Sequence, residues 1–392
     1  MADESLLPDG MRSLVHPRRG GPVPASATVD TGAVRTVRDL TRDVEPALED
    51  MFRSRRSYPE SVEAVRAWLR GEPDPVGAAA TASAVVRWQG VEDGPGRTAF
   101  VDAWAAEHGL PFAARAFTEL CAVDAGPFPK TTEWVLMPSM TPDQPDWWWG
   151  GEAMLRMRTL LAAADDADYE EAVTRLAAHR AQPQAAPSGR FLRVSVAGAA
   201  VPGTGSQNPM IDPFRRLAVS YLVPTELAWM DECIAETDFT RSIPTGALQL
   251  LCSLTDAGQV DVPKTSHVLL GLGNRCPEAV ATLAHEIGPA VVPVMRLPLR
   301  HHRRHRDERD VETRGALLDA AARLPYDSAF RLLADEVEDA AAGDALRTAL
   351  DLYPERAARL LAPGAETPLS TGPLADEILL EWTRARGGTG AA

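Results

Sequence analysis

Apolar residues recur every three or four positions in many short stretches of this chain. Phe330, Leu333 and Val337, for example, stand at i, i+3 and i+7. This spacing places side chains on one face of an α-helix and so predicts short amphipathic helices. Alanine and leucine are abundant and β-branched runs are short, which also favours helix over strand. The pattern therefore predicts a mainly α-helical fold with at most a few short strands.

The pattern becomes most regular from residue 213 onward, where the predicted helices are short and joined by turns of a few residues. The stretch Ala329–Ala334 is echoed by Ala357–Ala362, 28 residues later. A short helix cannot bury its apolar face alone, so neighbouring helices must stack on it. We therefore predict a HEAT-like α-solenoid in the C-terminal half. Its helices are expected near residues 214–221, 225–236, 244–255, 277–286, 309–323, 327–338, 344–352, 355–362 and 373–386.

The N-terminal half is predicted to be helical but less regular. Ser57 and Glu60 match a capping box, in which the serine accepts an orphan helix N–H and the glutamate reaches back. The helix after this box is expected to bury Val62 and Val65. The predicted organisation is a disordered leader at 1–30, an irregular helical domain at 31–181, a linker or loop with a candidate short strand at 182–212, helical repeats at 213–387 and a disordered tail at 388–392.

The charge of the chain bears on its partners. The 392 residues carry a net charge of −15 and give a pI near 5.1. Such a chain repels nucleic acid and anionic lipid unless basic residues gather on one face, and it favours a basic protein partner. No apolar run approaches the roughly 20 residues of a membrane span, and the first residues do not form a signal peptide. We expect a cytoplasmic protein without a membrane segment.

The four cysteines do not form a metal or redox motif. They are Cys121, Cys233, Cys252 and Cys276, and no two of them make a CxxC pair. In a large chain without a signal peptide, this arrangement predicts reduced and buried thiols.

Several segments resemble a known bacterial family. They are Phe100–Arg115, Tyr221–Glu226 with Trp229, Ala322–Leu333 and Tyr353–Leu361. These are similar to the N-terminal helical-repeat region of proteins carrying domain of unknown function 4132. That family is also described as MolR-like and is often linked to a WGR domain. The resemblance implies a helical-repeat region, provides no catalytic residues, and does not include the C-terminal domain that names the family.

A basic and histidine-rich run at residues 300–306 is the first candidate site. Arg300, Arg303, Arg304 and Arg306 suggest contact with an anion or with nucleic acid. His301 and His305 are four residues apart, the spacing that lets two imidazoles on one helix face share a metal. Acidic residues follow at once, from Asp307 onward, and aromatic residues for base stacking do not interleave the run. The simplest interpretation is therefore a solvated loop or helix start, with nucleic acid and metal unlikely.

A run of three tryptophans is the second candidate site. Successive side chains point in different directions, so Trp147, Trp148 and Trp149 cannot all enter one core. Either the run fastens a loop onto the helices, or part of it lines a groove for a partner or ligand. The candidate groove residues are Trp147, Trp148, Trp149, Arg215, Arg216 and Glu226.

Familiar catalytic and cofactor motifs fail on spacing. His285-Glu286 lacks the second histidine of a zinc-protease helix, and Gly271–Cys276 lacks the third glycine of a dinucleotide fingerprint. The sequence therefore predicts no catalytic residues and no cofactor. Its leading hypothesis is a non-enzymatic scaffold for a protein partner. The alternatives are a ligand-binding protein or enzyme that uses the cleft between the halves, and a DNA-linked or metal-linked regulator that acts through residues 300–306.

Overall fold

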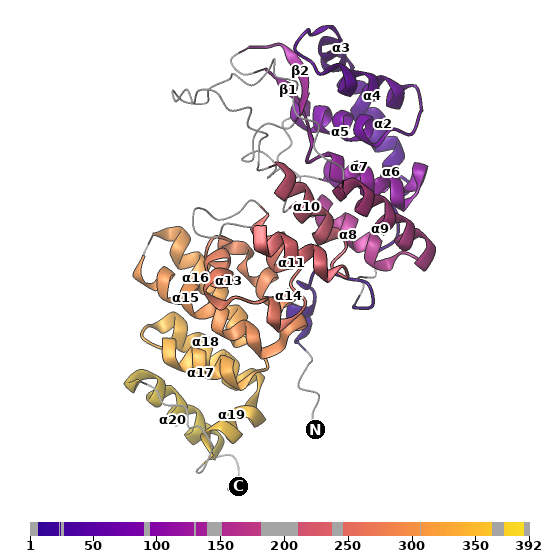
Figure 1. Ribbon diagram of the computed structural model, residues 1–392. Helices are drawn as coiled ribbons and strands as arrows, with labels where there is room; N and C mark the ends of the chain where they lie inside the picture. The colour runs from indigo at the N-terminus through magenta and orange to yellow at the C-terminus, as the bar shows by residue number, and fades with distance from the viewer. Residues whose placement is uncertain are drawn as a thin grey trace. The chain divides into compact units, whose positions relative to one another are not determined.

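The computed structural model describes residues 7–22, 24, 27–89, 95–128, 131–138, 151–181, 211–236, 246–305, 307–362 and 372–387. The described chain is mainly α-helical with one two-stranded sheet, which confirms the predicted fold class (Figure 1). It divides into two compact units. We call residues 17–237 the N-terminal unit, and residues 1–16 together with 238–392 the C-terminal unit.

The N-terminal unit is built from helices of two to four turns and one hairpin. Its elements are α2 (Ala33–Asp43), α3 (Glu45–Arg53), α4 (Pro59–Leu69), α5 (Pro75–Gln89), α6 (Pro95–His108), α7 (Leu110–Glu119), β1 (Val123–Pro127), β2 (Trp134–Pro138), α8 (Glu152–Ala163), α9 (Asp166–Ala181), α10 (Ile211–Leu222) and α11 (Leu227–Glu236).

Helix α5 forms the centre of this unit and packs against α4, α7 and β1. Its side chains from Gly77 to Val86 are all buried, and most of them are small. Because small side chains let helix backbones approach closely, α4 and α5 come into backbone contact at Gly77 and Ala64. The alanine-rich composition of α5 thus fixes the spacing of its neighbours.

The hairpin is antiparallel and pairs Ala125 with Leu136. Both outer N–H groups of this residue pair are satisfied by serines: the Leu136 N–H donates to Ser57 Oγ and the Ala125 N–H donates to Ser83 Oγ, each at 3.1 Å. Ser57 therefore differs from its predicted role as a helix cap. Its hydroxyl meets a strand edge, where a buried N–H without a partner would cost more than an N–H at a solvated helix end.

The C-terminal unit consists of a row of short helices. Its elements are α1 (Asp9–Arg12), α12 (Ala247–Leu251), α13 (Val262–Leu270), α14 (Cys276–Ile287), α15 (Val291–Arg304), α16 (Glu308–Ala322), α17 (Asp327–Glu336), α18 (Ala340–Leu352), α19 (Pro354–Leu361) and α20 (Pro373–Gly387), with single 3₁₀ turns at Ala257–Gln259, Gly273–Arg275 and Gly288–Ala290. Aspartates cap three of the helices: Asp261 begins α13, Asp307 begins α16 and Asp339 begins α18.

Alternate helices of this unit pack side by side. Helices α12, α14, α16, α18 and α20 form one series of contacts, and α13, α15 and α17 form a second (Figure 1). Helices α18 and α20 run parallel, because Gly343 lies against Ile378 and Asp351 accepts a hydrogen bond from the indole of Trp382. Helices α14, α15, α16, α17 and α18 thus each pack against the helix before the previous one as well as against a sequence neighbour.

The beginning of the chain differs from the expected disordered leader. Leu7, Met11 and His16 are buried, and α1 packs against α14. The sparse apolar residues of this segment are covered by a helix more than 260 positions later in the sequence. Periodicity within the segment does not reveal a contact over that distance.

The division between the units falls at residue 237 and not at 212, where the sequence placed it. Helix α10 packs against α7, α8 and α9, and α11 follows α10. Buried Arg158 of α8 reinforces this packing, because its Nη1 donates to the carbonyl of Tyr221 in α10 at 3.0 Å. The candidate strand at 191–196 and the tail at 388–392 lie outside the described residues. Every helix in the described part of the chain is too short or too polar to cross a bilayer.

Candidate functional site

The basic run lies on the last turn of α15 and on the turn that follows. Arg300, Arg303 and Arg304 belong to the helix, His305 caps it, and Arg306 lies outside the described residues. Positive side chains at a helix C-terminus interact favourably with the partial negative charge of the exposed carbonyls. The run therefore has a structural reason to stand at this end of α15.

Three arginines of α15 form ion pairs with the acidic end of α17. Arg296 Nη1 lies 2.9 Å from Asp335 Oδ2, and Arg300 Nε lies 3.2 Å from Glu336 Oε1. Arg303 Nη1 lies 3.5 Å from Glu336 Oε2 and 2.7 Å from Glu338 Oε1. Glu336 is almost fully buried, at 1% exposure. Two of the four predicted anion ligands, Arg300 and Arg303, are thus already neutralised by carboxylates of their own unit.

The first turn of α17 also forms ion pairs with arginines of a neighbouring helix. Asp327, in its first turn, accepts hydrogen bonds from Arg356 Nη1 at 2.6 Å and from Arg359 Nη2 at 2.8 Å, both on α19. Carboxylates of α17 are thus paired with arginines of both α15 and α19. Arg304 is exposed, and unlike Arg300 and Arg303 it forms no ion pair with another described residue.

The three histidines of the run contact one another and Asp310. The rings of His301 and His305 are tilted by 32° with centroids 4.4 Å apart, and the neighbouring His302 is buried with its Nδ1 2.5 Å from Asp310 Oδ1. Partial burial, together with the nearby His305 and His302, lowers the pKa of His301. The hydrogen bond from His302 lowers the pKa of Asp310. Within the described ranges, no group of three or more His, Cys, Asp or Glu side chains is placed to hold a metal ion.

The predicted groove residues fall in the N-terminal unit where they are described. Trp147, Trp148 and Trp149 lie outside the described residues, and of Arg215 the structure describes only its place on α10. Arg216 is half-buried on α10. Glu226 is half-buried in the turn before α11, and its charge acts on Tyr169 of α9.

Tyr169 of α9 makes a polar contact with the turn that contains Glu226. Its hydroxyl lies 2.8 Å from Thr225 Oγ1, and burial raises its pKa. The guanidinium of Arg19 lies over its ring, 4.5 Å from the centroid. These contacts join α9 to the turn between α10 and α11.

An exposed strip on α16 was not singled out by the sequence. Glu308, Val311, Glu312 and Gly315 stand at i, i+3, i+4 and i+7, so they share one face of the helix. Val311 is 60% exposed, the most open of the large apolar side chains in the described residues. Both glutamates are exposed and make no ion pair within the described part of the chain. An apolar anchor between free carboxylates is suited to a basic partner.

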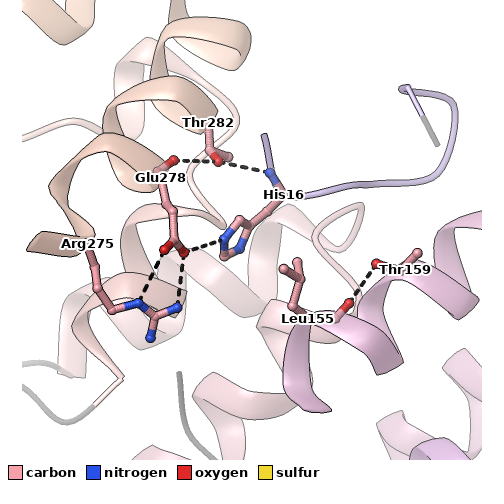
Figure 2. A network of polar contacts seen from close by, with 6 residues as sticks. All are labelled: His16, Leu155, Thr159, Arg275, Glu278 and Thr282. Atoms are coloured by element: carbon pink, nitrogen blue, oxygen red, sulfur yellow. Dashed lines mark hydrogen bonds and ion pairs between the residues drawn. The ribbon is translucent and has the colours of Figure 1, made fainter. Parts of the chain in front are cut away.

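A partly buried polar network around Glu278 was also missed (Figure 2). The N–H of His16 donates to Thr282 Oγ1 at 3.0 Å, and His16 Nε2 lies 3.4 Å from Glu278 Oε2. Arg275 Nη2 donates to the same carboxylate oxygen at 3.0 Å. Burial raises the pKa of Glu278, but the hydrogen bonds from His16 and Arg275 outweigh it and bring the pKa down to about 2.

The four cysteines are free and buried, in agreement with the sequence prediction. The Cys276 thiol donates to the carbonyl of Leu269 at 3.3 Å, and burial raises its pKa to about 12. A thiol held in this way is a weak nucleophile, because the thiolate is the reactive form.

Comparison with known proteins relates one part of the chain to a described domain. A family model described as the YehI second domain matches residues 33–190. The matched residues include α2 to α9 and the hairpin, and they lie within the N-terminal unit. No curated protein and no solved structure matches the chain. The similarity to the YehI second domain covers less than half of the chain and leaves the α16 strip and the Glu278 network outside it.

Proposed function

We propose that this protein is a helical-repeat scaffold that binds a basic protein partner through its C-terminal unit. The observation that carries the proposal is the packing of alternate helices in that unit, from α12 to α20. A HEAT-like array of this kind offers one side of every repeat to a partner while the other sides form the core. The repeated stretch at Ala329–Ala334 and Ala357–Ala362 supports the same interpretation, because it falls on α17 and α19.

The α16 strip supports a basic partner over an anionic one. Glu308 and Glu312 are exposed beside Val311, whereas Arg300 and Arg303 on α15 are ion-paired with carboxylates of α17 and its following turn. Charged groups without a partner among the described residues are available to an incoming protein, and complementary charge raises the association rate and the specificity. Nucleic acid is a poorer fit, because the net charge of the chain is −15.

A site-specific photocrosslinker tests this proposal. A benzophenone amino acid would replace Val311, and a second protein would carry it at Leu297 of α15, which is also exposed. In lysate of the source organism, we expect the α16 position to capture a basic protein. Capture should fall at least tenfold in 0.5 M salt and in the double variant Glu308→Lys, Glu312→Lys, because the attraction is electrostatic. Equal capture at both positions, or capture that ignores charge reversal, would refute the proposal.

The family relationship also enters as a proposal. We propose that the chain belongs with the MolR-like proteins. The support is the set of similar segments from Phe100 to Leu361 and the helical fold that the resemblance implies. The matching family model carries a different description, so the two relationships are separate predictions.

A further inference from the structure

Residues 7–16 bind to the C-terminal unit in the manner of a peptide ligand. Leu7, Met11 and His16 are buried to 2%, 1% and 2% exposure, while Asp9 and Arg12 between them are exposed. Only one side of the segment is therefore in contact with the unit. Alternating anchors and solvated residues of this kind are typical of short segments held in a groove.

The segment does not have the means to hold its own shape. Helix α1 contains four residues, and no side chain caps its N-terminus. Isolated helices shorter than about 12–15 residues are marginal in water, so a single turn needs an external surface to form. That surface is α14, against which α1 packs.

Polar contacts fix the end of the segment. Thr282 Oγ1 accepts from the backbone N–H of His16 and donates to the carbonyl of Glu278, so this hydroxyl is fully used. The carboxylate of Glu278 faces the His16 ring and is oriented by Arg275 (Figure 2). One contact is made by the backbone of residue 16 and the other by its imidazole, so a different residue at this position would keep the first contact and lose the second.

The segment is separate in sequence from the unit that it enters. The 221 residues from Pro17 to Thr237 form the N-terminal unit, and only then does the chain supply the rest of the C-terminal unit. All contacts of the segment with α14 are thus long-range, and no neighbouring helix in the sequence carries it into place. A segment with these properties is a candidate for exchange with another peptide that has the same anchors.

We propose that the α14 surface is a peptide-docking site. Its ligand is a linear segment with an apolar side chain, a second apolar side chain four residues later, and a histidine five residues after that. Residues 7–16 are the resident ligand, and a peptide with the same pattern binds in their place. This proposal does not depend on the α16 strip, which uses different residues.

Controlled release of the segment from the folded full-length chain tests the proposal. A protease recognition sequence is inserted between Gly20 and Gly21. Gly20 has a φ of +78°, and a side chain there would meet nothing within 4 Å. The protein is then cleaved, and a fluorescein-labelled, amidated peptide of residues 5–17 is added. We expect saturable binding by anisotropy to the cleaved protein and at least tenfold weaker apparent binding to the uncleaved protein, because the tethered segment competes.

Matched peptides and one protein variant identify the contacts. A peptide with His16→Ala should bind at least tenfold more weakly than the unmodified peptide, and so should the unmodified peptide to cleaved Glu278→Gln protein. A peptide with Arg12→Ala should bind as well as the unmodified one, because Arg12 is exposed and, among the described residues, its ion pair is with Asp9 of the same segment. The proposal is overturned if cleaved protein with an unchanged circular dichroism spectrum takes up no peptide. Equal binding of the His16→Ala and unmodified peptides would overturn it as well.

Discussion

The backbone of Gly77 in α5 lies against the carbonyl group of Ala64 in α4, and a Cβ atom on Gly77 would stand 2.1 Å from the Ala64 oxygen. That atom would also come within 2.8 Å of Trp68 Cβ. Gly77→Ala therefore forces the two helices apart at the centre of the N-terminal unit. We expect the free energy of unfolding to fall by about 2–3 kcal/mol, as for overpacked cores. Urea denaturation followed by tryptophan fluorescence measures it.

Gly315 in α16 is the matched control for this substitution. It is also a helical glycine, but it is exposed, and a Cβ on it would meet nothing within 4 Å. Gly315→Ala should raise stability by about 0.5–1 kcal/mol, because alanine has the higher helix propensity. If both substitutions changed stability in the same direction, the close contact of α4 and α5 would not be the cause.

Neighbouring acidic residues at the end of α17 should respond very differently to neutralisation. Glu336 is buried and faces Arg300 and Arg303, so Glu336→Gln removes the carboxylate beside Arg300 and leaves Arg303 with Glu338 alone. We expect a loss of about 1–3 kcal/mol, because the buried side chain loses its charge-assisted contacts while the arginines keep part of their solvation. Asp335→Asn removes a pair whose side chains are both more than a third exposed, and should cost less than about 1 kcal/mol. Thermal and urea unfolding of the two variants measure these losses. Equal losses of stability in the two variants would contradict the prediction.

The sequence located several of the later helices well, because there the periodic apolar stripe and the capping residues agree. It missed α13 and α15, and it placed the run 300–306 in a loop or helix start where the structure has the end of α15. The helix predicted at 309–323 is α16 at Glu308–Ala322, and that at 355–362 is α19 at Pro354–Leu361. Asp307 stands before α16 as its cap and Pro354 opens α19, which are both local signals.

What the sequence did not reveal depends on partners that are distant along the chain. Ser57 meets Leu136, and His16 meets Glu278. The sequence suggests that Arg300 is an unpaired cation, whereas in the structure it forms an ion pair with Glu336. Local pattern gives the type of each element, but the same residue has a different role when a carboxylate or an N–H from elsewhere reaches it. The candidate sites were therefore harder to predict than the fold.

The hydroxyl of Tyr353 should make the protein sensitive to alkali. It donates to the carbonyl of Arg323 at 2.5 Å, and burial raises its pKa to about 12. In the unfolded chain a tyrosine ionises near pH 10. Its contribution to stability is therefore complete below pH 10 and is lost as the pH rises toward 12. Tyr353→Phe should lower stability by about 1 kcal/mol at pH 7 and make the alkaline decline shallower.

Absorbance at 295 nm checks the same assignment independently. All five tyrosines of the urea-unfolded chain should titrate near pH 10. In the folded protein the buried Tyr169, Tyr326 and Tyr353 should all titrate later than in the unfolded chain. Tyr353→Phe should reduce the amplitude of the step near pH 12 by one tyrosine. If the absorbance step near pH 12 keeps its full amplitude in Tyr353→Phe, the step belongs to another tyrosine.

Glu278 should give the protein an acid-sensitive contact. Its pKa is about 2 in the folded state, against 4.5 for an unperturbed glutamate, because His16 and Arg275 hydrogen-bond to the ionised form. A lowered folded-state pKa stabilises the fold above the unfolded-state value and loses that effect as the pH falls from about 4.5 toward 2. Wild type should therefore exceed Glu278→Gln by about 1–3 kcal/mol at pH 7. The difference should shrink steadily below pH 4.5. Glu312→Gln is the control, because Glu312 is exposed and makes no ion pair in the described residues. Urea denaturation at pH 7, 4 and 3 measures the free energy of unfolding of the three proteins. If the stability difference between wild type and Glu278→Gln stayed constant across this range, the Glu278 carboxylate would not be the group responsible.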